Sequence, residues 1–500
     1  MWCGCVAPAT ATTVLPEIAS TQNAFKPLEL STFLPLVFSK HYNHNYVCTA
    51  SLMFYFPTST HKKFYLQEKA PIITPKNILF YTLATSKFLM NSINKQRCNQ
   101  NPNATAQHLL HNQNGIYIQS LIVPQNTIII GIGDLHGNLH TLASIIRKMQ
   151  KKQLIDEQGI IKDNVRIVIT GDVSDRGHFS LETWALLLML FHKNPQKVII
   201  LQGNHENRQC FLQSSFYHEL CRKYYHLNDQ ILNMISKSFQ DLFSLLPQVV
   251  FIGAPNNNGI VDFLQFNHGG LPTNVNESFY TPIAHFLCTT TTSNPTYPTS
   301  YLVLPSYPKI NGLIWNGYFA DEQDIPFQIN GFRISDTLSN PAQVTNYLQQ
   351  LKQQNTTYCV SGIIRGHDHL QGGVNQLLRT IITEDVWIQN TLATQRITWE
   401  MVDHKESVKI TLKDTDLSPV FTLTNSPLIS GTDSFAAITF NADSDHNCWI
   451  LTAYAYPREK YHNDGNNKDW LDADPLKKTT KSPHHQDKQP VQSYSYNCPK

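Results

Sequence analysis

Five short motifs in this 500-residue chain carry carboxylate, imidazole and amide side chains. They read GDLHGN at residues 133–138, GDVSDRG at 171–177, GNHE at 203–206, NHGG at 267–270 and RGHDH at 365–369. Such side chains are the usual protein ligands of metal ions. The six candidate ligands are Asp134, His136, Asp172, Asn204, His268 and His367.

This donor set combines three oxygen ligands with three imidazoles. It suits Mn, Fe or Zn and is too rich in nitrogen for Ca or Mg. A carboxylate can bridge two cations, and two cations about 3.5–4 Å apart lower the pKa of a shared water and clamp a tetrahedral anion. The set therefore predicts two divalent or trivalent transition metal ions as cofactors and favours hydrolysis of phosphate esters.

Three residues beside these ligands fit the same chemistry. His205 directly follows a candidate ligand and can donate a proton to a departing oxygen, and Asp175 can hold its imidazole in the needed orientation. Arg176 can face the phosphoryl oxygens, because a guanidinium binds two oxygens at once and keeps its charge. We therefore expect all three to be catalytic residues.

Short β-branched runs precede the motifs and are expected to position them. Residues 127–132, 165–170 and 197–201 read as buried strands that end at the first three motifs, and residues 261–266 and 358–364 lead into the last two. Amphipathic helices are expected between the strands, one of them over residues 181–193 with Ser180 as its N-cap. This alternation of strands and helices predicts a layered α/β domain.

The chain divides into three parts by composition. Residues 1–110 form an N-terminal region to which no role can be assigned, residues 111–456 form the expected catalytic domain, and residues 457–500 are polar and expected to be disordered. Within the domain, residues 210–246 are expected to be helical, whereas residues 272–312 resemble a loop insertion. Strand-like segments after residue 400 predict a second sheet that completes a sandwich.

Charge and cysteine content limit the partners and the compartment. The net charge of +2 gives no electrostatic reason to expect a nucleic acid. We expect neither a signal peptide nor a membrane segment. Ten cysteines without a CxxC pair are typical of a reduced compartment, so we expect a cytoplasmic protein.

In this order, the motifs resemble the PPP family of metal-dependent protein phosphatases, within the calcineurin-like metallophosphoesterase superfamily. Residues 207–268 also resemble the helical stretch of the eukaryotic enzymes. The resemblance implies a β-sandwich of two mixed sheets flanked by helices, with an extra N-terminal region. It also implies that Asp134 and His136 hold one metal, that Asp172 bridges, and that the other three ligands hold the second metal.

The resemblance further implies catalytic roles. His205 would be the acid with Asp175 behind it, Arg176 would bind phosphate, and Arg333 would be the second phosphate-binding arginine. The chain also departs from the family as a divergent member, since Gln202 replaces a usual Arg and residues 424–435 lack a usual Tyr. In divergence and Asn- and Gln-rich composition it resembles family members that intracellular bacteria deliver into host cells.

The sequence thus predicts a phosphoprotein phosphatase. It would hydrolyse phosphomonoesters of Ser or Thr, with Tyr left open, by direct attack of a metal-bridging hydroxide. Two alternatives stay open, a small-molecule phosphoesterase such as a dinucleoside polyphosphatase and a non-catalytic scaffold that binds a phosphoprotein. The expected partner is a phosphoprotein substrate, and a regulatory partner is left open.

Overall fold

A computed structural model gives the structure of most of the predicted catalytic domain and two N-terminal helices. The described residues are 27–37, 73–100, 116–207, 211–212, 214–272, 277–292, 299–304, 312–318, 328–329, 337–339, 341–352, 357–367, 380–383, 386–388, 397–402, 407–413, 420–425, 432–442 and 448–457.

A seven-stranded mixed sheet carries the first three motifs. The strands β2 (Ile128–Ile132), β3 (Val165–Ile169) and β4 (Val198–Ile200) are parallel neighbours, with β4 at one edge of the sheet, and β17 (Thr432–Asn441) pairs antiparallel with β2. The strand order is β14 (Ile397–Val402), β15 (Ser407–Lys413), β18 (Cys448–Pro457), β17 (Thr432–Asn441), β2 (Ile128–Ile132), β3 (Val165–Ile169) and β4 (Val198–Ile200).

A six-stranded mixed sheet carries the last two motifs. Its strands β6 and β11 are parallel neighbours, so their carboxyl ends lie at the same edge. The strand order is β16 (Val420–Thr422), β11 (Tyr358–Arg365), β6 (Val261–Asn267), β5 (Val249–Pro255), β1 (Ile116–Ile122) and β7 (Ser300–Leu304).

The two sheets bury a common apolar layer. Ile129 and Val168 of the seven-stranded sheet belong to the same buried cluster as Leu264, Phe266 and Ile364 of the six-stranded sheet. Because successive strand residues point to opposite faces, Ile130 and Ile167 instead pack on the outer side of their sheet. The predicted sandwich of two mixed sheets is thus confirmed.

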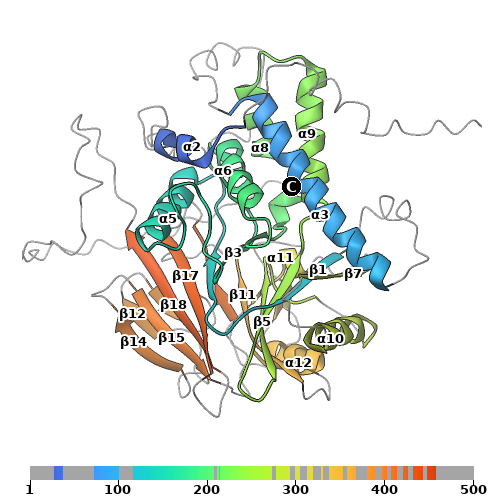
Figure 1. The fold of residues 1–500 in the computed structure, drawn as a ribbon, viewed down its shortest axis with the longest axis vertical. Coiled ribbons are helices and arrows are strands. Elements are labelled where there is room, and N and C mark those ends of the chain that lie inside the picture. The colour runs from blue at the N-terminus through green and yellow to red at the C-terminus, as the bar shows by residue number, and fades with distance from the viewer. Residues whose placement is uncertain are drawn as a thin grey trace, which may run out of the picture. The chain divides into compact units, whose positions relative to one another are not determined.

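Helices cover both outer faces of the sandwich (Figure 1). The helices α5 (Leu139–Lys151), α6 (Ser180–Lys193), α8 (Ser215–Lys223) and α9 (Asp229–Phe243) share a core with the seven-stranded sheet. On the six-stranded sheet lie α10 (Glu277–Thr292) and α12 (Pro341–Lys352). The short elements are α11 (Gly312–Trp315), β8 (Gly317–Tyr318), β9 (Gln328–Ile329), β10 (Thr337–Ser339), β12 (Thr380–Thr383), β13 (Val386–Ile388) and η6 (Asn204–Glu206).

Two N-terminal helices pack into the hydrophobic core beside the seven-stranded sheet. Phe33 of α2 (Leu30–Val37) and Ile78 of α3 (Pro75–Gln100) are fully buried in the cluster that contains Trp184 of α6. The Thr82 hydroxyl of α3 also donates a 3.0 Å hydrogen bond to Ser238 Oγ of α9. These described pieces of the N-terminal region therefore belong to the fold, whereas the boundary at residue 110 stays a prediction.

Two local predictions were wrong. Residues 272–312 are not simply a loop, because they contain α10 and β7; Phe279, Ile283 and Leu287 of α10 are buried, and this packing outweighs the low helix propensity of its threonines. Ser180 does not cap α6 but is its first residue.

In the described part of the chain, no helix combines the length and apolar character needed to cross a membrane.

Candidate active site

The five motifs meet where parallel strands of the two sheets end. Asp134, Asp172 and Asn204 follow β2, β3 and β4, whereas His268 and His367 follow β6 and β11. Because the carboxyl ends of adjacent parallel strands lie at one edge, residues far apart in sequence come together. The backbone N–H of His367 donates to both carboxylate oxygens of Asp134, at 3.0 and 2.9 Å, across the two sheets.

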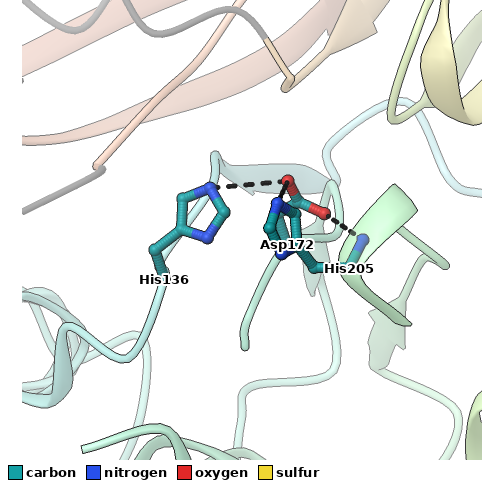
Figure 2. Close-up of side chains that lie close together, drawn as sticks. All are labelled: His136, Asp172 and His205. Atoms are coloured by element: carbon teal, nitrogen blue, oxygen red, sulfur yellow. Dashed lines mark hydrogen bonds and ion pairs between the residues drawn. The ribbon is translucent and has the colours of Figure 1, made fainter. Parts of the chain in front are cut away.

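Asp172 lies at the centre of the cluster. Its Oδ2 atom is 3.4 Å from Nε2 of His136 and 3.2 Å from Nε2 of His268, and it has no hydrogen-bond partner of normal geometry among the described residues. Asp172 is only 1% exposed. Figure 2 shows the side chains of His136 and His205 beside this carboxylate. A buried carboxylate oxygen aimed at two imidazole nitrogens suits a cation better than a hydrogen bond.

Asn204, His268 and His367 form a second group beside Asp172. Asn204 Oδ1 lies 2.9 Å from His268 Nε2 and 3.0 Å from His367 Nδ1, and these two nitrogens are 3.2 Å apart. Donor atoms around one transition metal, each about 2.1 Å from it, have spacings near these values. The described residues thus form two possible metal groups that share Asp172.

The ring orientations of two histidines are fixed by backbone carbonyls. His136 Nδ1 lies 2.8 Å from the carbonyl oxygen of Ser174, and His268 Nδ1 lies 2.8 Å from that of Thr170. A carbonyl oxygen only accepts, so each Nδ1 donates, and in the neutral ring each Nε2 directs its lone pair toward Asp172. This arrangement leaves both rings ready to bind a cation.

Burial and charge shift the acidity of the cluster. Burial works to raise the pKa of Asp172, but the imidazoles of His268 and His205 outweigh it and hold that pKa well below its usual range. Burial raises the pKa of Asp134 to about 6. For His268, burial works to lower the pKa, yet the carboxylates of Asp172 and Asp134 raise it to about 9. Metal binding to such a site would have to displace a proton.

His205, Asp175 and Arg176 lie at the outer side of the cluster. His205 Nδ1 is 2.6 Å from Asp175 Oδ2, so it donates to that carboxylate, and its Nε2 is 4.0 Å from Asp172 Oδ2. The His205 side chain is 21% exposed, and Arg176 Nη2 lies 3.4 Å from its Nε2. Burial lowers the pKa of His205, but Asp172 and Asp175 outweigh it and raise that pKa.

The backbone of the site is strained. Among the described residues, six non-glycine residues have positive φ, and five of them were predicted from the sequence as site residues. Non-glycine residues adopt this left-handed region at a cost, typically where the surroundings impose it at functional sites. The five are His136, Asp172, Asp175, Arg176 and His367, with φ of 44°, 49°, 70°, 64° and 75°.

Glu206 was not identified from the sequence as a residue of the site. Glu206 is fully buried, and its carboxylate accepts four backbone N–H groups at 2.7–3.1 Å. Its place in the GNHE motif was the available signal. The four donors are the backbone N–H groups of Asp172, Val173, Ser174 and Gly203.

The structure therefore brings together nine of the ten predicted site residues. Their roles as ligands, acid and phosphate-binding group stay predictions. The tenth, Arg333, lies outside the described residues.

Comparison with known proteins agrees with this geometry. The family model of the calcineurin-like phosphoesterases matches residues 128–371. The chain is 37% identical over 106 residues to the serine/threonine-protein phosphatase PP1-1 of Saccharomyces cerevisiae. The aligned segment covers 21% of this chain and 31% of that protein. It is 32% identical over 158 residues to the serine/threonine-protein phosphatase 6 catalytic subunit of Caenorhabditis elegans. This aligned segment covers 32% of this chain and 40% of that protein.

A solved structure of a protein serine/threonine phosphatase from Saccharomyces cerevisiae, with similarity to human phosphatase PP5, aligns with 78% of this chain and 92% of that one, at 15% identity and a TM-score of 0.44. The chain spans only about a third of the length of the curated relatives that it matches. Over residues 128–371 the chain is similar to the calcineurin-like phosphoesterases, a family whose fold implies bound metal ions.

Proposed function

We propose that this chain is a metal-dependent phosphoprotein phosphatase of the PPP type. The observation that supports this best is the gathering of nine functional side chains from five strand ends at one place, with a buried carboxylate at its centre. The matched segments of two serine/threonine-protein phosphatases support the substrate class.

The donor set fits two metal ions that share one carboxylate. His136 and Asp172, which lie in one group with His205, would hold one ion together with Asp134. Asp172 with the second group, Asn204, His268 and His367, would hold the other. When bound, two such ions would lower the pKa of a water molecule and neutralise phosphoryl oxygens. Mn, Fe and Zn all suit this mixed set of oxygen and nitrogen donors.

The remaining residues act on the substrate. His205 would donate its Nε2 proton to the leaving side-chain oxygen, and Asp175 keeps the ring oriented through the 2.6 Å bond to Nδ1. Arg176, half-buried beside His205, would bind the phosphoryl oxygens. Arg333 stays our proposal for a second phosphate-binding arginine.

The experiment compares substrates and metals. Purified protein would be stripped with EDTA, reloaded with Mn, Fe or Zn, and assayed with matched phosphoserine, phosphothreonine and phosphotyrosine peptides and with diadenosine tetraphosphate. We expect metal-dependent hydrolysis of phosphopeptides that falls by about 10²–10⁴-fold in His205→Asn. Faster turnover of diadenosine tetraphosphate would favour a small-molecule phosphoesterase. No hydrolysis of any substrate, with phosphopeptide binding retained, would favour a non-catalytic scaffold.

We also propose a reducing compartment such as the cytoplasm, which includes that of a host cell. The ten cysteines include no CxxC pair, and among the described residues Cys221, Cys288 and Cys359 form no disulfide bond. Peptide mapping under non-reducing conditions tests this, and disulfide-linked peptides from protein isolated out of its own cell would contradict it.

A further inference from the structure

The turn at Asp175 and Arg176 is held from outside the metal cluster. Both residues have left-handed backbone, with φ of 70° and 64°. Two consecutive strained residues keep this conformation only if surrounding bonds fix it. Two backbone N–H groups anchor the turn: the Asp175 N–H donates to Ser180 Oγ at 3.1 Å, and the Gly177 N–H donates to the His136 carbonyl at 2.9 Å.

The first residues of α8 contact this turn directly. The Ser215 hydroxyl donates to Asp175 Oδ1 at 3.1 Å and accepts the backbone N–H of Arg176, also at 3.1 Å. The backbone N–H of Phe216 donates to the same carboxylate oxygen at 2.7 Å. Ser215 thus links Asp175, which would orient His205, to Arg176, which would bind phosphate.

Further along the same face, α8 is fixed to the start of α6. Glu219 is 2% exposed, and its carboxylate accepts the first two helical N–H groups of α6, those of Ser180 and Leu181, at 3.0 Å each. The N-cap of α6, Phe179, has no side-chain capping bond, so Glu219 caps that helix from a different element. The helix α8 therefore holds both the turn itself, through Ser215, and the start of α6 that follows the turn, through Glu219.

Lys223 completes this attachment. Its ammonium group lies 2.7 Å from Glu219 Oε1 and 2.5 Å from Glu182 Oε2, and it donates to the His178 carbonyl at 3.0 Å. Ser215, Glu219 and Lys223 are spaced four residues apart, so they lie on one face of α8.

We propose that Ser215 and Glu219 are positioning residues that hold the Asp175–Arg176 turn, so that His205 can donate its proton and Arg176 can bind phosphate. This inference rests on the proposed phosphatase function. The two residues touch neither substrate nor metal in this scheme. They act through Asp175 and Arg176.

The main test uses Ser215→Ala, because this surface residue can lose its hydroxyl without disturbing the core. An alkoxide leaving group needs a proton donor far more than p-nitrophenolate does. We therefore expect kcat on a phosphoserine peptide to fall about tenfold, with a clearly smaller loss on p-nitrophenyl phosphate. Calorimetric binding of inorganic phosphate should weaken about threefold through Arg176. Ser215→Thr, which keeps the hydroxyl, should restore both.

Ser214→Ala is the matched control. Ser214 is the N-cap of α8, and its Oγ accepts the Tyr217 N–H, so this variant weakens the helix without removing a bond to Asp175. We expect it to lower the melting temperature and to affect both substrates equally. The inference is overturned if Ser215→Ala behaves like this control, or if both its rates and its phosphate affinity stay within twofold of the wild type.

Glu219→Gln gives an independent measurement. It removes the charge and one of the two acceptor oxygens, and we expect the same selective loss on the phosphoserine peptide. If this buried variant does not fold, Ser215→Ala still decides the question. A wild type without metal-dependent activity would overturn the proposed function and this inference together, whereas an active wild type with an unaffected Ser215→Ala overturns the inference alone.

Discussion

The carboxylate of Glu206 accepts the backbone N–H of Asp172 at 2.7 Å, so the side chain of one motif fixes the backbone of another. Three more backbone N–H groups bind the same carboxylate. Asp172 itself has a φ of 49°. The left-handed backbone of Asp172 is therefore held by a fully buried side chain.

Replacing this carboxylate should affect both stability and activity. In Glu206→Gln, the amide NH₂ would face backbone donors, and buried N–H groups would lose their acceptor. We expect a loss of about 3 kcal/mol in the free energy of unfolding, measured with urea. Glu157→Gln, at an exposed position, is the matched control and should change stability by less than about 0.5 kcal/mol. Equal stability of the two variants would contradict the role given to Glu206.

Removing the shared carboxylate should release metal from both groups. We expect Asp172→Asn to bind Mn at least about 100-fold more weakly than the wild type, because its Oδ2 atom faces both sets of donors. Metal content after gel filtration, measured by mass spectrometry, checks this. The control is Asp163→Asn at the surface, which should keep its metal. Full metal content in Asp172→Asn would exclude the shared site.

Lys223 should stabilise the fold in a pH-dependent way. Burial raises the pKa of the Glu182 carboxyl, although Lys223 acts to lower it. In Lys223→Met, two buried carboxylates lose their cation, which should cost about 3–5 kcal/mol at neutral pH. A carboxyl whose folded pKa is raised contributes stability that is present below its unfolded pKa and lost as pH rises through its folded pKa.

The cost of Lys223→Met should therefore be larger at neutral pH than near pH 5 by roughly 1 kcal/mol or more. Urea unfolding at both pH values measures it. Lys237→Met removes an exposed lysine that pairs with Asp241, so it should show little cost at either pH. A loss of stability in Lys223→Met that is larger at acid pH than at neutral pH would contradict this prediction.

The N-terminal helix α2 should behave as part of the catalytic core. Phe33 is fully buried, and its helix packs against α5 and α6, so Phe33→Ala should destabilise the protein by about 3–5 kcal/mol. Leu83→Ala in α3, at a position that is 38% exposed, should cost far less. A single thermal transition that moves down in Phe33→Ala would show that α2 and the sandwich unfold together. A Phe33→Ala variant with unchanged stability would contradict this packing.

Much of the site could be predicted from the sequence because its chemistry is local. Each candidate ligand follows a predicted strand, and strand ends in an α/β sheet place side chains at a common edge. His205 and Asp175 could be paired for the same reason, since their strands β4 and β3 are parallel neighbours. Residue type and strand position thus predicted the nine site residues that the structure brings together, whereas the tenth, Arg333, lies outside the described residues.

Other features depended on contacts between distant residues. The capping of α6 by Glu219 and the four bonds of Glu206 join separate motifs, and no local pattern signals such bonds. The helix in residues 277–292 formed because its apolar side chains found a core to pack against, which composition alone does not reveal. The left-handed turn at Asp175 and Arg176 follows from bonds that only the folded chain can supply. The sequence by itself determined which groups are candidates for the chemistry, because residue type and strand position are local, and tertiary packing decided how these groups are held.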